Sequence, residues 1–134
     1  MKFFVIAFAA CIVSAFAGIT DEQRMKLKEY KTACIAETGV DEAVIDNVKN
    51  GNQVEFDDKM NCFSACMFKK VGIMRPDGTI DDEVARAKAP QDLPMDKVDQ
   101  IIETCKAQVG KDNCETGGKI MSCLLKTKTG TILD

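Results

Sequence analysis

Histidine and tryptophan are absent from the 134-residue chain, and tyrosine occurs only once. Without histidine there can be no Ser-His-Asp triad and no imidazole to activate a cysteine, so the usual hydrolase sites are excluded. Histidine is also the side chain that most often changes its charge near neutral pH, so this kind of pH switch is missing. We therefore expect a protein that is not an enzyme and that uses no cofactor.

Basic residues are too few and too scattered for nucleic acid to be the partner. The chain has 18 Lys and Arg against 21 Asp and Glu, and no stretch gathers the basic residues into a phosphate-neutralising stripe. One acidic run, Asp81-Asp82-Glu83, offers paired carboxylates. It follows a turn at the start of an expected helix, where acids interact favourably with the helix dipole. We interpret this run as a helix start rather than a catalytic pair.

The one long apolar run lies at the N-terminus. Lys2 precedes it, Phe3 to Phe16 is apolar apart from Ser14, and Ala15-Phe16-Ala17 ends it with small residues at the A-x-A spacing. The run has about 15 residues, whereas a membrane-spanning helix needs about 20. We predict a secretory signal peptide over residues 1–17, cleaved after Ala17, and one domain over residues 18–134. A retained membrane anchor is the alternative.

Apolar residues recur at helical spacing in six stretches, and no stretch alternates like a strand. The predicted helices cover about residues 21–37, 41–49, 56–71, 81–89, 95–108 and 114–128, so the fold class is all-α. Thr20 can cap the first helix, and Gly72 is placed to end the third. Arg75-Pro76-Asp77-Gly78 is a turn by composition. Gly117-Gly118 weakens the last helix by up to about 1 kcal/mol per glycine relative to alanine.

Cleavage after Ala17 would remove Lys2 and Cys11, leaving 17 basic and 21 acidic residues, a net charge of −4, and six cysteines. An even number of cysteines in a short secreted chain implies disulfides. Cys62 and Cys66 lie one turn apart on one helix face, so each should reach a different neighbouring helix. Six cysteines allow fifteen disulfide connectivities, and spacing alone does not select one of them. A zinc site is not expected, because zinc sites use C-x2-C knuckles or histidine.

The six cysteines are spaced C-x27-C-x3-C-x38-C-x8-C-x8-C, and the segment Cys62-Phe63-Ser64-Ala65-Cys66 is followed by the turn Pro76-Asp77-Gly78. This pattern resembles the insect odorant-binding protein family, the general odorant-binding and pheromone-binding proteins with six cysteines, over the whole mature chain. The resemblance implies a compact bundle of about six helices around an internal apolar cavity. It also implies the disulfides Cys34–Cys66, Cys62–Cys114 and Cys105–Cys123.

The same resemblance implies a secreted, extracellular carrier, present in sensillum lymph or another secretory fluid. Its ligand would be a small apolar molecule: a volatile odorant, a pheromone or a fatty-acid-like compound. A membrane chemoreceptor is a further possible partner, and the protein would be a monomer or a weak homodimer. The alternative is a venom or salivary protein that uses the same fold to carry or sequester lipid-like ligands. A membrane-active defence protein is disfavoured by the net charge of −4, since such proteins are typically cationic.

Pocket residues in this family commonly lie a turn or two from the cysteines. That register predicts a first set of ligand-contact residues. Three aromatic or thioether side chains of the third helix form a second set, which is predicted less strongly. The first set is Leu27, Phe68, Met74, Ile102, Ile120 and Leu124, and the second is Phe56, Met60 and Phe63. Ordinary core packing is the alternative for each of them. Some family members carry a ligand-facing hydroxyl at the position of Phe68, so this chain favours an apolar or aromatic ligand. The short tail Thr129 to Asp134 is interpreted as a lid.

Overall fold

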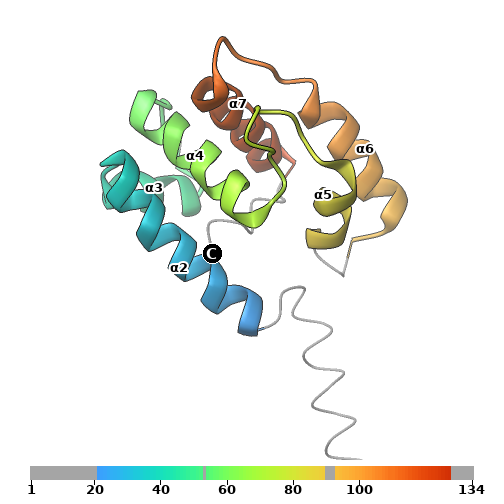
Figure 1. Cartoon of the computed structure of the whole chain (residues 1–134), viewed down its shortest axis with the longest axis horizontal. Coiled ribbons are helices and arrows are strands. Elements are labelled where there is room, and N and C mark those ends of the chain that lie inside the picture. The colour runs from blue at the N-terminus through green and yellow to red at the C-terminus, as the bar shows by residue number, and fades with distance from the viewer. Residues whose placement is uncertain (1–20, 53, 90–92, 128–134) are drawn as a thin grey trace, which may run out of the picture.

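The computed structural model describes residues 21–52, 54–89 and 93–127, and this part of the chain contains six α-helices (Figure 1). They are α2 (Asp21–Thr38), α3 (Glu42–Lys49), α4 (Asp58–Val71), α5 (Asp82–Lys88), α6 (Met95–Lys106) and α7 (Asn113–Lys126). The only β pairing in these ranges is an isolated bridge between Met74 and Ile80. The prediction of an all-α fold is therefore confirmed. The signal segment 1–17, the cap at Thr20 and the tail 129–134 lie outside the described residues.

Capping residues set the helix boundaries to within a few positions of those predicted. Asp57 accepts a hydrogen bond from the backbone N–H of Met60 at 2.8 Å, so α4 begins at Asp58 and not at Phe56. Gly72 ends the same helix in the left-handed region, with φ of 93°. None of the helices in the described ranges is both long and apolar enough to cross a bilayer.

Three disulfides join four of the helices. Cys34–Cys66 links α2 to α4, Cys62–Cys114 links α4 to α7, and Cys105–Cys123 links α6 to α7. These are the three predicted pairs. Cys62 and Cys66, one turn apart on α4, reach different helices as their shared face requires. Helix α4 is thus the centre of the frame, with α2 on one side and α7 on the other (Figure 1).

The two consecutive glycines of α7 allow it to approach α4 closely. A Cβ atom at Gly117 would lie 2.5 Å from the backbone nitrogen of Ala65, and one at Gly118 would meet the side-chain amide of Asn61. Both glycines are buried. The two glycines lower the helix propensity of α7, as expected from the sequence, but they allow its backbone to contact the backbone of α4.

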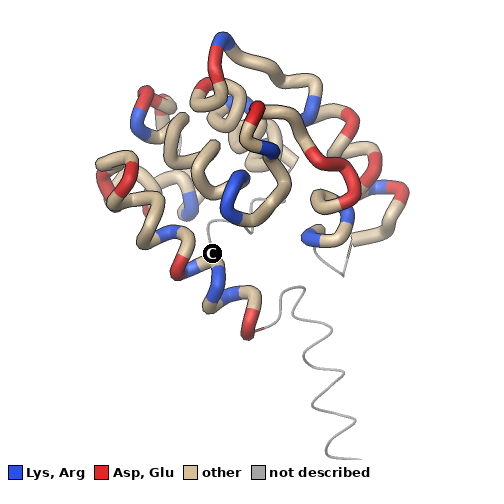
Figure 2. Tube along the Cα trace, viewed as in Figure 1, with Lys and Arg blue, Asp and Glu red and all other residues tan. Residues whose placement is uncertain are grey.

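The hydrophobic core lies mainly on α4 and α7, where large side chains such as Phe63, Phe68 and Met121 are fully buried. Helix α5 differs, because it contains no buried residue. Ion pairs hold it to α6: Arg86 Nε donates to Asp99 Oδ1 at 2.5 Å, and Lys106 pairs with an acid at the start of α5. Figure 2 shows acidic and basic residues interspersed along the helices, without a stripe of one sign.

Candidate ligand-binding cavity

An apolar cavity of about 120 Å³ lies between α5, α6, α7 and the C-terminal end of α4, and it is partly open to solvent. Twelve of its fourteen lining residues are apolar. They are Phe68, Ile73, Ile80, Ala85, Ala89, Leu93, Val98, Ile101, Ile102, Cys105, Ile120 and Leu124. A cavity with such walls favours an apolar occupant over water.

The walls follow from the helical repeat of two helices and from one turn. On α6, Val98, Ile101 and Ile102 fall at three- and four-residue spacing, so they share one face. On α7, Ile120 and Leu124 lie one turn apart. The Cys105–Cys123 disulfide holds these two helices together beside the cavity.

The turn between α4 and α5 supplies another part of the wall. Its chain reverses at Gly78, whose N–H donates to the carbonyl of Arg75 at 2.9 Å and whose φ is 91°. The reversal places Ile73 beside Ile80, and both line the cavity. The turn predicted at residues 75–78 is therefore confirmed.

Four of the nine predicted ligand-contact residues line this cavity. They are Phe68 on α4, Ile102 on α6, and Ile120 and Leu124 on α7. The helices α4, α6 and α7 thus bring them together. Their contact with a ligand stays a prediction.

The other five predicted residues do not line this cavity. Met60 and Phe63 are fully buried in the core, and Met74 is 2% exposed. Leu27 and Phe56 are partly buried and pack against the outside of the core. Helical spacing identifies an inward-facing residue, but it does not show whether the space in front of that residue is filled by another side chain. For Met60, Phe63 and Met74 the burial shows that core side chains occupy this space, and the ligand contact of all five residues stays a prediction.

Several wall residues were not identified from the sequence. Ile73 and Ile80 flank the turn, and only the chain reversal brings them to the cavity. Ala85 lies on α5 and Ala89 directly follows it, in a segment where few large apolar residues mark an inner face. An apolar residue on each side of the predicted turn was the one available signal for Ile73 and Ile80.

Two lysines, Lys88 and Lys106, are the charged residues of the lining. The Nζ atom of Lys106 lies 2.9 Å from Glu103 Oε1 and 3.0 Å from Asp82 Oδ2. Hydrogen bonds to Glu103 and then to Asp82 raise the pKa of Lys106 above its ordinary value. This ammonium is therefore already neutralised by carboxylates at the rim.

The acidic side chains near the cavity have structural roles. Asp81 caps α5 by accepting a hydrogen bond from the N–H of Val84 at 3.2 Å, as expected for a helix start. Asp77 accepts hydrogen bonds from the hydroxyl of Thr79 at 2.6 Å and from its N–H at 3.0 Å. These bonds lower the pKa of Asp77. Asp77 and Asp81 therefore stabilise the turn and the helix start, respectively.

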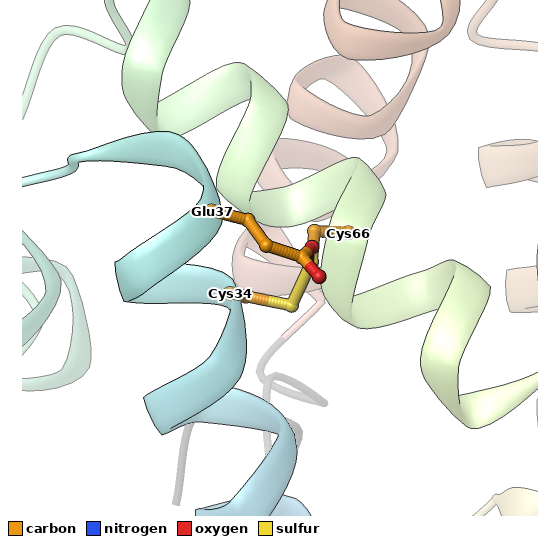
Figure 3. A group of neighbouring side chains, drawn as sticks. All are labelled: Cys34, Glu37 and Cys66. Carbon is orange, nitrogen blue, oxygen red and sulfur yellow. Dashed lines mark hydrogen bonds between the residues drawn. A yellow bond between two sulfur atoms is a disulfide. The ribbon is translucent and has the colours of Figure 1, made fainter.

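One cluster of cysteine and acid outside the cavity is shaped like a metal site but has different chemistry. Glu37 lies over the Cys34–Cys66 disulfide, with its Oε2 atom 3.1 Å from the sulfur of Cys66 (Figure 3). The sulfurs are bonded to each other, so neither is a thiolate ligand and neither carries a proton to donate. The other carboxylate oxygen of Glu37 pairs with Lys70 at 3.4 Å.

The sequence matches the PBP/GOBP family over residues 17–127. The chain belongs to this family. Among the similar proteins of this family is general odorant-binding protein 56a of Drosophila melanogaster, which is 28% identical over 91% of this chain and 90% of its own. The B2 protein of Tenebrio molitor is 29% identical over 87% of this chain and 91% of its own.

A solved structure of the same family supports the fold. It is the fatty acid binding protein OBP56a from the oral disk of the blowfly Phormia regina, with 31% identity and a TM-score of 0.69. The alignment covers 82% of this chain and 95% of the blowfly chain. PBP/GOBP proteins are secreted carriers of small hydrophobic ligands and are not enzymes. The apolar cavity of this member fits that description.

Proposed function

We propose that this protein is a secreted carrier that binds an odorant or pheromone in its cavity and transports it for chemosensory delivery. The observation that carries the proposal is the cavity of about 120 Å³ with twelve apolar residues among fourteen in its lining. An engineered apolar cavity of about 150 Å³ binds benzene, so this cavity has room for a group of about six carbons. Burial of apolar surface, at about 25 cal/mol per Å², supplies the affinity without a charged contact.

Secretion is part of the same proposal. Cleavage after Ala17 would release residues 18–134 with the six cysteines of the three disulfides. Disulfides form and persist in oxidising compartments, which supports this route. N-terminal sequencing of protein from the source fluid should begin at Gly18. Recovery of the chain in a membrane fraction with Met1 intact would contradict it.

A second candidate function is the carriage of lipid-like ligands in a secretion outside the olfactory organs. The blowfly relative, named for fatty acid binding and for the oral disk, favours this candidate. The two functions differ in the tissue where the protein is made. Antennal expression would favour odorant delivery, whereas expression in glands or mouthparts would favour lipid carriage.

Native mass spectrometry of protein purified from its source tests the carrier function directly. We expect one non-covalent small molecule per chain, on a monomer or weak homodimer. The purified, emptied protein should also bind the neutral probe N-phenyl-1-naphthylamine at one site, and volatile apolar compounds should displace it. Protein that carries no bound molecule and shows no saturable probe binding would contradict the proposal.

A further inference from the structure

Helices α2 and α4 are joined by two neighbouring links, one covalent and one ionic. Cys34 and Glu37 lie about one turn apart on α2, and Cys66 and Lys70 lie about one turn apart on α4. The two cysteines form the disulfide, and Glu37 Oε1 pairs with Lys70 Nζ at 3.4 Å. None of these four residues lines the cavity, so their arrangement needs an explanation of its own.

The two sulfur-bearing residues differ in their access to solvent. Cys34 is 0% exposed, whereas Cys66 is half-buried, so a dissolved thiol reaches the bond from the side of Cys66. The Oε2 atom of Glu37 lies 3.1 Å from the sulfur of Cys66. Figure 3 shows this side chain reaching from α2 across to Cys66. A carboxylate therefore lies at the accessible end of the disulfide.

We propose that Glu37 shields the Cys34–Cys66 disulfide from reduction by anionic thiols such as glutathione. Reduction begins when a thiolate attacks Cys66: a bond forms between the incoming sulfur and Cys66, and the Cys34–Cys66 bond breaks with its electron pair leaving on Cys34 as a thiolate. A second thiolate then attacks the incoming sulfur, which releases Cys66 as a thiolate and leaves the reductant as a disulfide. This inference does not depend on the carrier function.

The surroundings disfavour attack on either sulfur. A thiolate that approaches Cys66 brings its negative charge next to the carboxylate of Glu37, and like charges repel. The bond that breaks then leaves a thiolate on Cys34, where burial disfavours the charged form. Attack on Cys34 is hindered by the same burial, and it would release Cys66 as a thiolate beside Glu37. Lys70 carries the opposite charge, so Glu37 and Lys70 should change the reduction rate in opposite directions.

Reduction of the folded protein by dithiothreitol, at neutral pH and low ionic strength, measures this shielding. Alkylation and peptide mass spectrometry give the initial rate at each disulfide. We expect Glu37→Gln to lose the Cys34–Cys66 bond about fivefold faster than the wild type, the effect of one unit charge at about 4 Å in a water-like dielectric. Lys70→Gln should slow the reaction by about twofold, since its ammonium pairs with the other carboxylate oxygen. The Cys105–Cys123 bond should keep its wild-type rate in both variants.

The opposite signs separate charge from loosening of the structure, because both substitutions break the same ion pair. Acceleration in both variants, or an unchanged rate in Glu37→Gln, would overturn the inference. Glu29→Gln is the matched control, since it removes an exposed glutamate about two turns away on α2, and it should leave the rate unchanged.

A second reductant tests the sign of the charge on the attacking molecule. Cysteamine carries an ammonium that offsets the charge of its thiolate, so it should reduce Glu37→Gln and the wild type at similar rates. The same fivefold acceleration with cysteamine would overturn the inference, because it would indicate easier access rather than weaker repulsion. Added salt should narrow the difference that dithiothreitol shows between Glu37→Gln and the wild type.

Discussion

Replacing Ala85 by leucine tests whether the cavity is the ligand site. Ala85 is a half-buried residue of α5, and it lines the cavity. Leucine adds three carbons at a position where the structure has empty apolar space, and it is nearly as good a helix former as alanine. We therefore expect Ala85→Leu to fill much of the cavity without disturbing the helix.

The stability gain is estimated from the apolar surface that the leucine side chain buries. Three newly buried carbons, at about 0.8 kcal/mol each, contribute about 2.4 kcal/mol. A leucine that fits should therefore raise the free energy of unfolding of the ligand-free protein by about 2 kcal/mol, and it should weaken the binding of a neutral probe at least about tenfold, because probe and leucine compete for the same volume.

The measurements are urea unfolding with the disulfides intact and fluorescence titration with N-phenyl-1-naphthylamine. Ala87→Leu is the matched control, since Ala87 is an exposed residue of the same helix outside the lining. It makes the same chemical change, and stability should move by no more than about 0.5 kcal/mol. Unchanged probe affinity in Ala85→Leu would refute the assignment of the ligand site to this cavity.

Three further predictions concern the frame around the cavity. Gly117→Ala should lower the free energy of unfolding in urea by about 1–3 kcal/mol, because the added Cβ meets the backbone of Ala65. Gly118→Ala should lower it by less, because its Cβ meets the side chain of Asn61, which can rotate. Equal losses in the two variants would contradict this. Because the folded pKa of Asp77 is lowered, its contribution to stability is present above about pH 4 and lost as the pH falls through the folded pKa. The acid unfolding curve of Asp77→Asn, followed by circular dichroism, should lack that component. Removing the Cys105–Cys123 bridge, which spans 18 residues, by double alanine substitution should cost about 3 kcal/mol of unfolding free energy in urea.

The helices and the disulfide frame were largely predictable because their signals are local or periodic. Asp57 and Gly72 are capping residues, and they mark the ends of α4 within two residues of the prediction. The pairing of Cys62 and Cys66 with different helices followed from their one-turn spacing. The complete set of three disulfides came from the family resemblance, since spacing alone leaves fifteen pairings.

The cavity was less predictable, because a cavity exists only where the packed side chains leave space unfilled. Phe63 and Phe68 lie on one helix and are both fully buried, yet only Phe68 borders the cavity. The contribution of Ala85 depends on how α5 packs against α6 through ion pairs, which no local pattern encodes.

The three disulfides form one continuous covalent path through α2, α4, α7 and α6, and α5 stands outside it. Helix α5 has no buried residue, and its ion pairs to α6 are partly exposed, so it is the wall of the cavity that no disulfide fixes. Since surface ion pairs weaken as salt is added, we expect α5 to be held less firmly against α6 at high ionic strength.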